Sequence, residues 1–185
     1  MEQIGDKKKY DLRHEWVTIE NISPYLIQAV VATEDNRFMK HHGIDFGAIK
    51  KARAFNQRST KRKRGASTIS QQTAKNVFLW PARTYIRKGF EVYFTLLIET
   101  VWSKKRVMEV YLNMIEMGPG IYGAEAAAQH YFKKSASKLT RHEAVLIAVS
   151  LPNPRKRNPA KPTKYMLRRQ QQILSLMRKI GKIEL

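Results

Sequence analysis

The sequence contains no cysteine, and its acidic residues are few beside its basic ones. Without cysteine the chain can form neither a disulfide scaffold nor a thiolate metal site, and it has no thiol nucleophile. The redox compartment stays open, because a cysteine-free chain folds on either side of a membrane. Lys and Arg number 35 against 15 Asp and Glu, which gives a formal net charge of +20. A charge of this sign favours polyanions or anionic surfaces as partners.

Long hydrophobic runs are also missing. The longest apolar segments, residues 92–98 and 144–151, fall short of the roughly 18–20 residues that span a bilayer. The first nine residues end in three lysines with no apolar stretch behind them, so they do not resemble a signal peptide. The sequence as written therefore predicts a soluble or peripheral protein, and it leaves open the removal of an anchor.

What is present is enough apolar material for a core, with 43% hydrophobic residues in 185. This excludes a wholly disordered chain and predicts one domain spanning residues 1–185. Basic residues concentrate in two stretches without acids, eight of them in residues 50–64 and ten in residues 151–183. Such clusters suit nucleic acid, anionic lipid headgroups or pyrophosphate, although a single surface lysine more often serves solubility.

Helical signals dominate the chain. Thr68 and Thr140 each open a capping box, and Ser23 precedes a proline at a first helical position. The expected helices cover residues 25–33, 46–56, 68–79, 83–102, 104–115, 123–132, 144–150 and 163–180. Residues 57–65 are expected to be a mobile loop, and the only weak strand pattern is at residues 16–20. We therefore predict an all-α fold, a helical domain with a basic cleft.

Aromatic and glycine positions give further expectations. Phe46, Ile49 and Phe55 share one helical face, and we expect Phe46 and Ile49 to belong to the core rather than to an exposed lobe. Gly89 interrupts a good helix, which suggests close packing or the approach of a ligand. Residues 123–132 are small and rich in alanine, so a close packing partner is expected there.

Three segments could carry chemistry. Glu34 and Asp35 end an apolar helix, where one carboxylate with a raised pKa would suit a general base. The alternative is an ordinary helix end with local ion pairs and a structural His41. The second segment, residues 65–76, puts a glycine and hydroxyls before a helix start and Lys75 two turns on. It suits an anion, or plain capping.

The third segment places cations beside a carboxylate. Arg87 and Lys88 lie four and three residues before Glu91, so the three can share a helix face, with Arg83 a further turn back. The functional interpretation is a carboxylate among cations that hold a charged leaving group. The alternative is a surface salt bridge, worth at most about 1 kcal/mol.

In this order, the three segments resemble the glycosyltransferase domain of bacterial peptidoglycan polymerases. Its first motif is matched by Glu34, Asp35, Phe38, His41 and Gly43. Its second is matched by Gly65, Ser67, Thr68, Ile69, Gln71 and Gln72, followed by Lys75. Its third is matched by Arg87, Lys88, Glu91 and Glu99. Its fourth is matched by residues 111–113, including Asn113, and its fifth by residues 120–132, including Gly123. The resemblance covers about residues 27–162, with Ala66 and Leu96-Leu97 as departures.

The resemblance implies a lysozyme-like, mainly helical fold with a large lobe and a small membrane-facing jaw, followed by a basic helix over residues 163–180. It implies polymerisation of lipid II into β-1,4-linked strands, with inversion and release of undecaprenyl pyrophosphate. Glu34 would be the general base and Glu91 the second catalytic carboxylate. Substrate binding would fall to Asp35, Ser67, Gln72, Lys75, Arg83, Arg87 and Lys88. Motif-structural roles would fall to Phe38, His41, Gly43, Glu99, Asn113 and Gly123. The basic stretch 50–64 is expected to order when substrate binds.

The implied setting is the outer face of the cytoplasmic membrane. The partners would be lipid II, the growing glycan strand, an anionic membrane surface and penicillin-binding transpeptidases, but not nucleic acid. No transpeptidase module follows, so the resemblance is to monofunctional enzymes. These carry an N-terminal transmembrane helix that this chain lacks, so we expect a truncated or unusual member. No cofactor is required by the sequence, and a divalent cation, Mg²⁺ or Mn²⁺, is left open.

Two rival functions remain. A lysozyme-like enzyme that cleaves glycan would show one dominant acid and no pyrophosphate-binding cations, and the cations around Glu91 argue against it. A basic nucleic-acid-binding module would explain the charge, but no helix-turn-helix, zinc-ligand or RNP-type signal is visible.

Overall fold

The computed structural model describes residues 11–59, 63–81 and 84–185. These residues form a mainly helical fold, as predicted, together with one small sheet. The α-helices are α1 (Pro24–Glu34), α2 (Phe46–Arg58), α3 (Ile69–Phe78), α4 (Tyr85–Val101), α5 (Lys104–Met114), α6 (Ala124–Phe132), α7 (Arg141–Ser150) and α8 (Lys164–Ile180). The 3₁₀ helices are η1 (Ile19–Asn21), η2 (Phe38–Lys40) and η3 (Ala136–Lys138).

The sheet was not predicted. Its strands are β1 (Arg13–His14), β2 (Glu116–Gly118) and β3 (Ile121–Tyr122), in the order β1-β3-β2. β1 pairs in parallel with β3, and β2 pairs antiparallel to it. The weak strand pattern at residues 16–20 does not form a strand, because the chain there leads into η1. Strands of two or three residues are too short to show an alternating pattern, so the sequence carried no signal for them.

Local capping explains where the helices begin. Thr68 and Thr140 form complete capping boxes with Gln71 and Glu143, as predicted. Ser103 caps α5 by accepting a hydrogen bond from the Arg106 amide. α8 begins at its Thr163 cap and ends at Gly181, whose φ is +76°. These interactions satisfy backbone groups that a helix terminus otherwise leaves unpaired.

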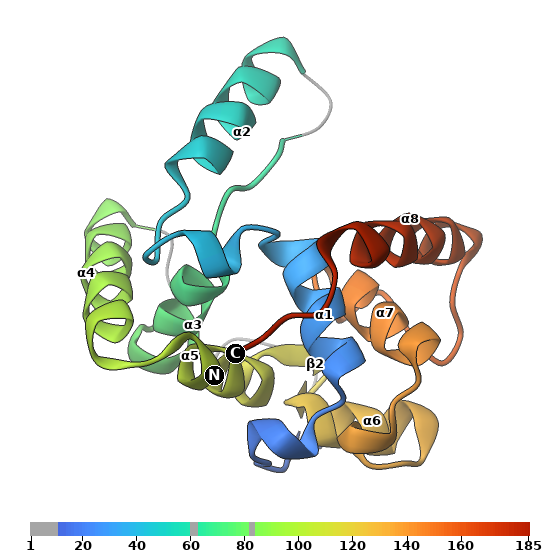
Figure 1. Cartoon of the computed structure of the whole chain (residues 1–185). Coiled ribbons are helices and arrows are strands. Elements are labelled where there is room, and N and C mark those ends of the chain that lie inside the picture. Colours follow the sequence, from blue (N-terminus) through green and yellow to red (C-terminus); the bar gives the residue numbers. More distant parts are fainter. Residues whose placement is uncertain (1–10, 60–62, 82–83) are drawn as a thin grey trace.

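The helices form two packed groups (Figure 1). α1 packs against α7 and α8, and α3 packs against α4 and α5. The core runs through both groups, with fully buried side chains such as Leu26, Phe38, Met108 and Ile147. The end of α1 thereby lies beside α3, where the first two sequence motifs meet.

Helix α2 projects away from both groups (Figure 1). Ala52 is its one buried residue among those described. The expectation that Phe46 and Ile49 belong to the core is therefore wrong: their exposed fractions are 76% and 40%, and Phe55 is 43% exposed. The apolar face of α2 is real, but no described element covers it.

Two small-residue expectations have opposite outcomes. At Gly123, where φ is +85°, an added Cβ would lie 2.8 Å from the Asn113 carbonyl oxygen, and Ala124, Ala127 and Ala128 are fully buried. Close packing of this segment is confirmed. At Gly89 nothing described lies within 4 Å of an added Cβ. The expectation of close packing at Gly89 is therefore wrong, because that face of α4 is open.

Candidate active site

Glu34 is the last residue of α1, and it lies half-buried against α3. Its Oε2 accepts a hydrogen bond of 3.0 Å from the Gln72 side-chain amide. Burial raises the pKa of Glu34, and the neighbouring charge of Asp35 adds to the rise. The Gln72 hydrogen bond and the charge of Arg157 act in the opposite direction and lower the pKa. A positioned carboxyl with a raised pKa has the properties of a general base at near-neutral pH.

Asp35, the next residue, is buried. Its exposed fraction is 6%, and its two carboxylate oxygens lie 2.9 and 3.0 Å from His41 Nε2. A carboxylate only accepts, so His41 is the donor. Oδ2 also accepts a bond of 3.1 Å from the Ile69 amide, at the start of α3. The structure thus places Asp35 where it joins α1 to α3, and the structural interpretation of His41 agrees with this contact.

Lys104 and Glu99 form a second polar network next to the contact between Asp35 and His41. The Lys104 ammonium donates to the His41 carbonyl oxygen at 2.7 Å and to both Glu99 oxygens at 2.8 and 2.9 Å. It also lies 4.6 Å from the centre of the Phe38 ring. Ser70 Oγ donates to Glu99 from α3. Glu99 therefore holds three segments together, and its side chain is only 5% exposed.

Gly43 lies where the first motif contacts the start of α3 and the side of α4. Its φ is +83°, and its carbonyl oxygen accepts a bond of 2.5 Å from Thr68 Oγ1. An added Cβ would lie 2.7 Å from Thr95 Cγ2 and 3.0 Å from Glu99 Cγ. Only glycine combines this backbone conformation with this approach.

Replacing Gly43 tests that constraint. Gly43→Ala is expected to lower the free energy of unfolding by about 1–3 kcal/mol, because it strains the backbone and crowds Thr95. Gly89→Ala is the matched control, since its Cβ meets open space on a helix, and it should raise stability by up to about 1 kcal/mol. Urea unfolding measures both. Equal stability of Gly43→Ala and the parent chain would contradict the constraint.

Arg87 and Lys88, the two described members of the predicted cation row, lie beside Glu91 on α4. The Glu91 side chain is only 6% exposed; it pairs with Lys88, and it lies 3.6 Å from Arg87 Nη1. Lys88 remains half exposed, whereas Arg87 is largely buried. Arg87 Nε is buried without a hydrogen-bond partner among the described atoms. The helix face predicted from the spacing is confirmed, and the buried carboxylate fixes the two cations.

The other predicted anion-binding residues are less closely joined. Lys75 lies on α3, one helical turn beyond Gln72, and its amine has no ion-pair partner within residues 11–59, 63–81 and 84–185. Ser67 is exposed just before the Thr68 cap. Arg83 lies outside the described residues, as do Lys61 and Arg62 of the basic stretch. Within the described residues, no hydrogen bond or ion pair joins Glu34 to Glu91.

Asn113 and Gly123 lie on the other side of α5, at the small sheet. The Asn113 amide donates to the Val17 and Glu109 carbonyl oxygens at 2.9 and 2.8 Å, and its Oδ1 accepts from the Val17 amide at 3.0 Å. These bonds attach the segment after β1 to α5. Both motif residues therefore have structural contacts.

Three residues of this region were missed as site residues. Lys104 joins the two networks, Tyr111 lies behind Gln72, and Arg157 acts on Glu34 through its charge. The Tyr111 hydroxyl is 3.5 Å from Gln72 Oε1, and burial together with the Glu34 charge raises its pKa well above the ordinary value. Tyr111 precedes the fourth motif's asparagine, so position alone could have indicated it. Lys104 and Arg157 sit in ordinary basic contexts that give no such signal.

The described part of the chain contains neither a metal-binding cluster nor a helix that could span a membrane. There, no three His, Asp or Glu side chains gather as a metal-binding group. A divalent cation stays an untested expectation. None of the helices described is both long and apolar enough to cross a bilayer.

The mainly helical fold and the two carboxylate sites are those of an enzyme. Comparison with known proteins identifies its family. Residues 2–178 match the family model described as Transglycosylase, so the chain belongs to the transglycosylase family.

Individual relatives agree with this assignment. The chain is 57% identical over 182 residues to a biosynthetic peptidoglycan transglycosylase of Bacteroides thetaiotaomicron, covering 98% of this chain and 73% of the relative. A protein of the same name from Shewanella oneidensis is 53% identical over 175 residues, covering 95% and 75%. One from Escherichia coli is 54% identical over 173 residues, covering 94% and 72%.

Proposed function

We propose that this protein is a peptidoglycan glycosyltransferase that polymerises lipid II into β-1,4-linked glycan strands. The observation that carries the proposal is Glu34, a half-buried carboxyl with a raised pKa, held by Gln72 in a chain of the transglycosylase family. The substrates that follow from this activity are lipid II and the growing strand. Synthesis of peptidoglycan places the action outside the cytoplasm.

In the proposed reaction, Glu34 takes the proton from the 4-hydroxyl of the acceptor sugar. The oxygen then attacks the anomeric carbon of the donor, and undecaprenyl pyrophosphate leaves from the opposite face. One displacement converts an α-linked donor into a β-1,4 linkage, so the configuration inverts. The transition state carries positive charge at the anomeric carbon, which a nearby carboxylate stabilises.

The leaving group carries several negative charges, and the cations of α3 and α4 would balance them. Lys75 is free to contact a ligand, and Lys88 is half exposed. Glu91 pairs with Arg87 and Lys88 and sets their positions, which would make it a second essential carboxylate. Pre-positioned cations lower the barrier without reorganising during the reaction. From its sequence position four residues before Arg87, Arg83 is expected to supply a further cation.

The proposal includes binding to an anionic membrane surface, since lipid II is membrane-bound. Large apolar side chains are exposed along α2 and α4: Phe46, Phe55, Tyr85, Ile86, Tyr93, Leu97 and Val101. Exposed patches of this kind mark protein or membrane contacts, and basic residues add attraction to anionic lipids. Co-sedimentation with anionic vesicles should be strong for the parent chain and weaker for Ile86→Ser, which removes apolar surface without adding charge. Equal binding of the parent chain and the variant to the vesicles would count against membrane contact through these residues.

The activity is tested by product analysis. The protein is incubated with labelled lipid II in detergent, and separately with preformed glycan strands. A polymer that lysozyme digests to disaccharide units supports the proposal. Shortened strands and no polymer would instead indicate the lysozyme-like hydrolase.

The acid limb of the pH–rate profile should depend on Gln72. Glu34 acts as a base only when deprotonated, so activity falls as pH drops through its pKa. The Gln72 amide stabilises the charged form, and its loss in Gln72→Ala raises the pKa of Glu34 further. The acid limb should therefore move to higher pH. Gln171→Ala on the exposed face of α8 is the control, and an unmoved limb in Gln72→Ala would contradict the assignment.

A further inference from the structure

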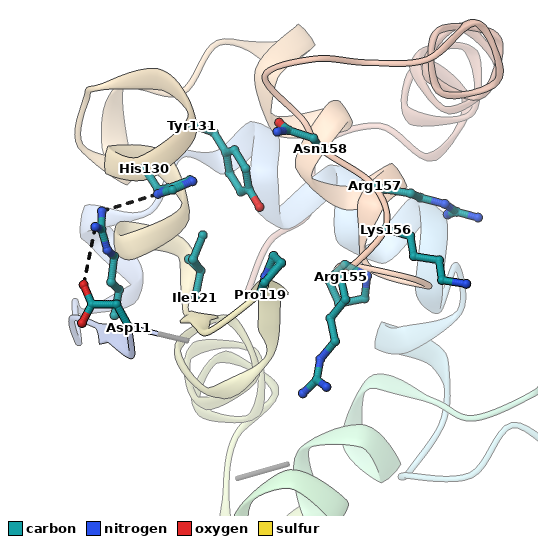
Figure 2. A pocket seen from close by; sticks show the side chains of 11 residues that line it. Asp11, Pro119, Ile121, His130, Tyr131, Arg155, Lys156, Arg157 and Asn158 are labelled. Atoms are coloured by element: carbon teal, nitrogen blue, oxygen red, sulfur yellow. Dashed lines mark hydrogen bonds and ion pairs between the residues drawn. The ribbon is translucent and has the colours of Figure 1, made fainter. Parts of the chain in front are cut away.

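A cavity of about 350 Å³ lies beside the small sheet (Figure 2). It is lined by the turn between β2 and β3, by helix α6, and by the loop of residues 154–158. Its polar lining comes from three separate segments of the chain. The polar side chains include Arg13, His130, Tyr131, Arg155, Lys156 and Asn158.

The lining has an excess of positive charge. Arg13 lies 3.6 Å from the exposed carboxylate of Asp11, and Arg155 bonds to Glu116 at 3.0 and 3.1 Å. Lys156 and Arg157 have no carboxylate partner in ion-pair distance among the described residues. Two cations thus remain uncompensated, so the cavity favours an anionic ligand.

One cation is held in place by an aromatic neighbour. The Arg13 guanidinium lies 3.5 Å from His130 Nδ1. Burial and the charges of Arg13 and Lys133 lower the pKa of His130, which keeps the ring neutral and able to accept this bond. Arg13 therefore contacts Asp11 and His130, and all three residues line the cavity.

The rest of the lining is apolar. Ile121, Pro119 and Pro154 contribute to the wall, and the Tyr131 ring projects toward the loop across the cavity (Figure 2). A site with an apolar wall, a few polar groups and cations at its edge suits a small group with both carbon surface and carboxylates. A short acidic peptide has this chemistry.

Arg157 links the cavity to the reaction site. Arg157 belongs to the loop that lines the cavity, and its charge lowers the pKa of Glu34. Its Nη1 also bonds to the Val149 carbonyl oxygen at 2.7 Å, which fixes the loop to the end of α7. A group attached to the reacting sugar could thus extend past Arg157 into the cavity.

The geometry points to a subsite for the carboxylate-bearing peptide branch of the glycan substrate. This inference rests on the proposed function, because only that function supplies a sugar with such a branch. The cations would contact the carboxylates of the peptide, and the apolar wall would contact its side chains.

The test compares lipid II with free peptide carboxylates and lipid II with those carboxylates amidated. The variant is Arg13→Gln combined with Lys156→Gln, two changes outside the reaction site. For the free-acid substrate, KM should rise roughly threefold to tenfold with little change in kcat, because charge-assisted contacts are lost. For the amidated substrate, KM should not change. The matched control removes two exposed cations elsewhere, with Lys138→Gln and Lys161→Gln.

Each alternative result overturns the subsite. Equal KM values of the parent enzyme for both substrates would do so, as would an equal rise for both in the variant or the same rise in the control. A second readout does not need activity: calorimetric titration with the free acidic peptide should show binding to the parent chain and not to the variant. If the parent chain makes no polymer from either substrate, the proposed function fails, and the titration alone decides the cavity.

Discussion

Glu34→Gln is expected to abolish polymerisation of lipid II while leaving the fold intact. Glutamine keeps the shape of the side chain and can still bond to Gln72, but it cannot take a proton. Loss of a general base costs roughly 10²–10⁴-fold in rate. The measurement is polymer formation from labelled lipid II, with circular dichroism and a melting curve on the same preparation.

The control for this variant is Glu15→Gln, which changes an exposed glutamate. It should polymerise at the rate of the parent chain. A folded Glu34→Gln variant that still makes polymer at a comparable rate would remove Glu34 from the role of base. The family assignment would stand, and Asp35 and Glu91 would be the next carboxylates to examine.

Among single substitutions near the site, Lys104→Met is expected to cause the largest loss in the free energy of unfolding. It leaves the Glu99 carboxylate buried without its cation and removes a donor from the His41 carbonyl oxygen. Breaking a buried pair by removing one partner costs about 3–5 kcal/mol. Urea unfolding at neutral pH measures the change in the free energy of unfolding.

The neighbouring residue provides a matched control. Lys105 pairs with Glu20 at 2.7 Å, but both side chains are at least half exposed. Lys105→Met should leave stability unchanged within error, because solvent screens exposed pairs. Adding Glu99→Gln to Lys104→Met should recover part of the loss, since no charge is then stranded. Similar losses in the two lysine variants, or no recovery, would contradict the account of the buried pair.

Helix positions were predictable because their signals are local. The capping boxes at Thr68 and Thr140 and the cap at Ser103 specify helix starts within four residues of sequence. The cation row around Glu91 followed from helical spacing in the same way. In both cases the relevant contacts join residues three or four positions apart.

The missed features depend on contacts between distant segments. Lys104 bonds to the His41 carbonyl oxygen 63 positions earlier, and no local pattern distinguishes it from Lys105. The exposure of Phe46 could not be predicted either, because an amphipathic pattern shows that a helix has an apolar face but not that an element covers it. The cavity beside residues 154–158 combines segments more than 100 positions apart.

The hydrogen bond from Thr68 to Gly43 has a consequence for how this protein can vary. It joins the two ends of the segment that carries α2, so the chain leaves the packed helices and returns to them at nearly one point. The entropy of closing a loop grows only slowly with its length. The projecting segment can therefore lengthen, shorten or change its sequence between related proteins without moving Glu34. Adaptation to different lipids or envelopes can proceed there while the chemistry is left untouched.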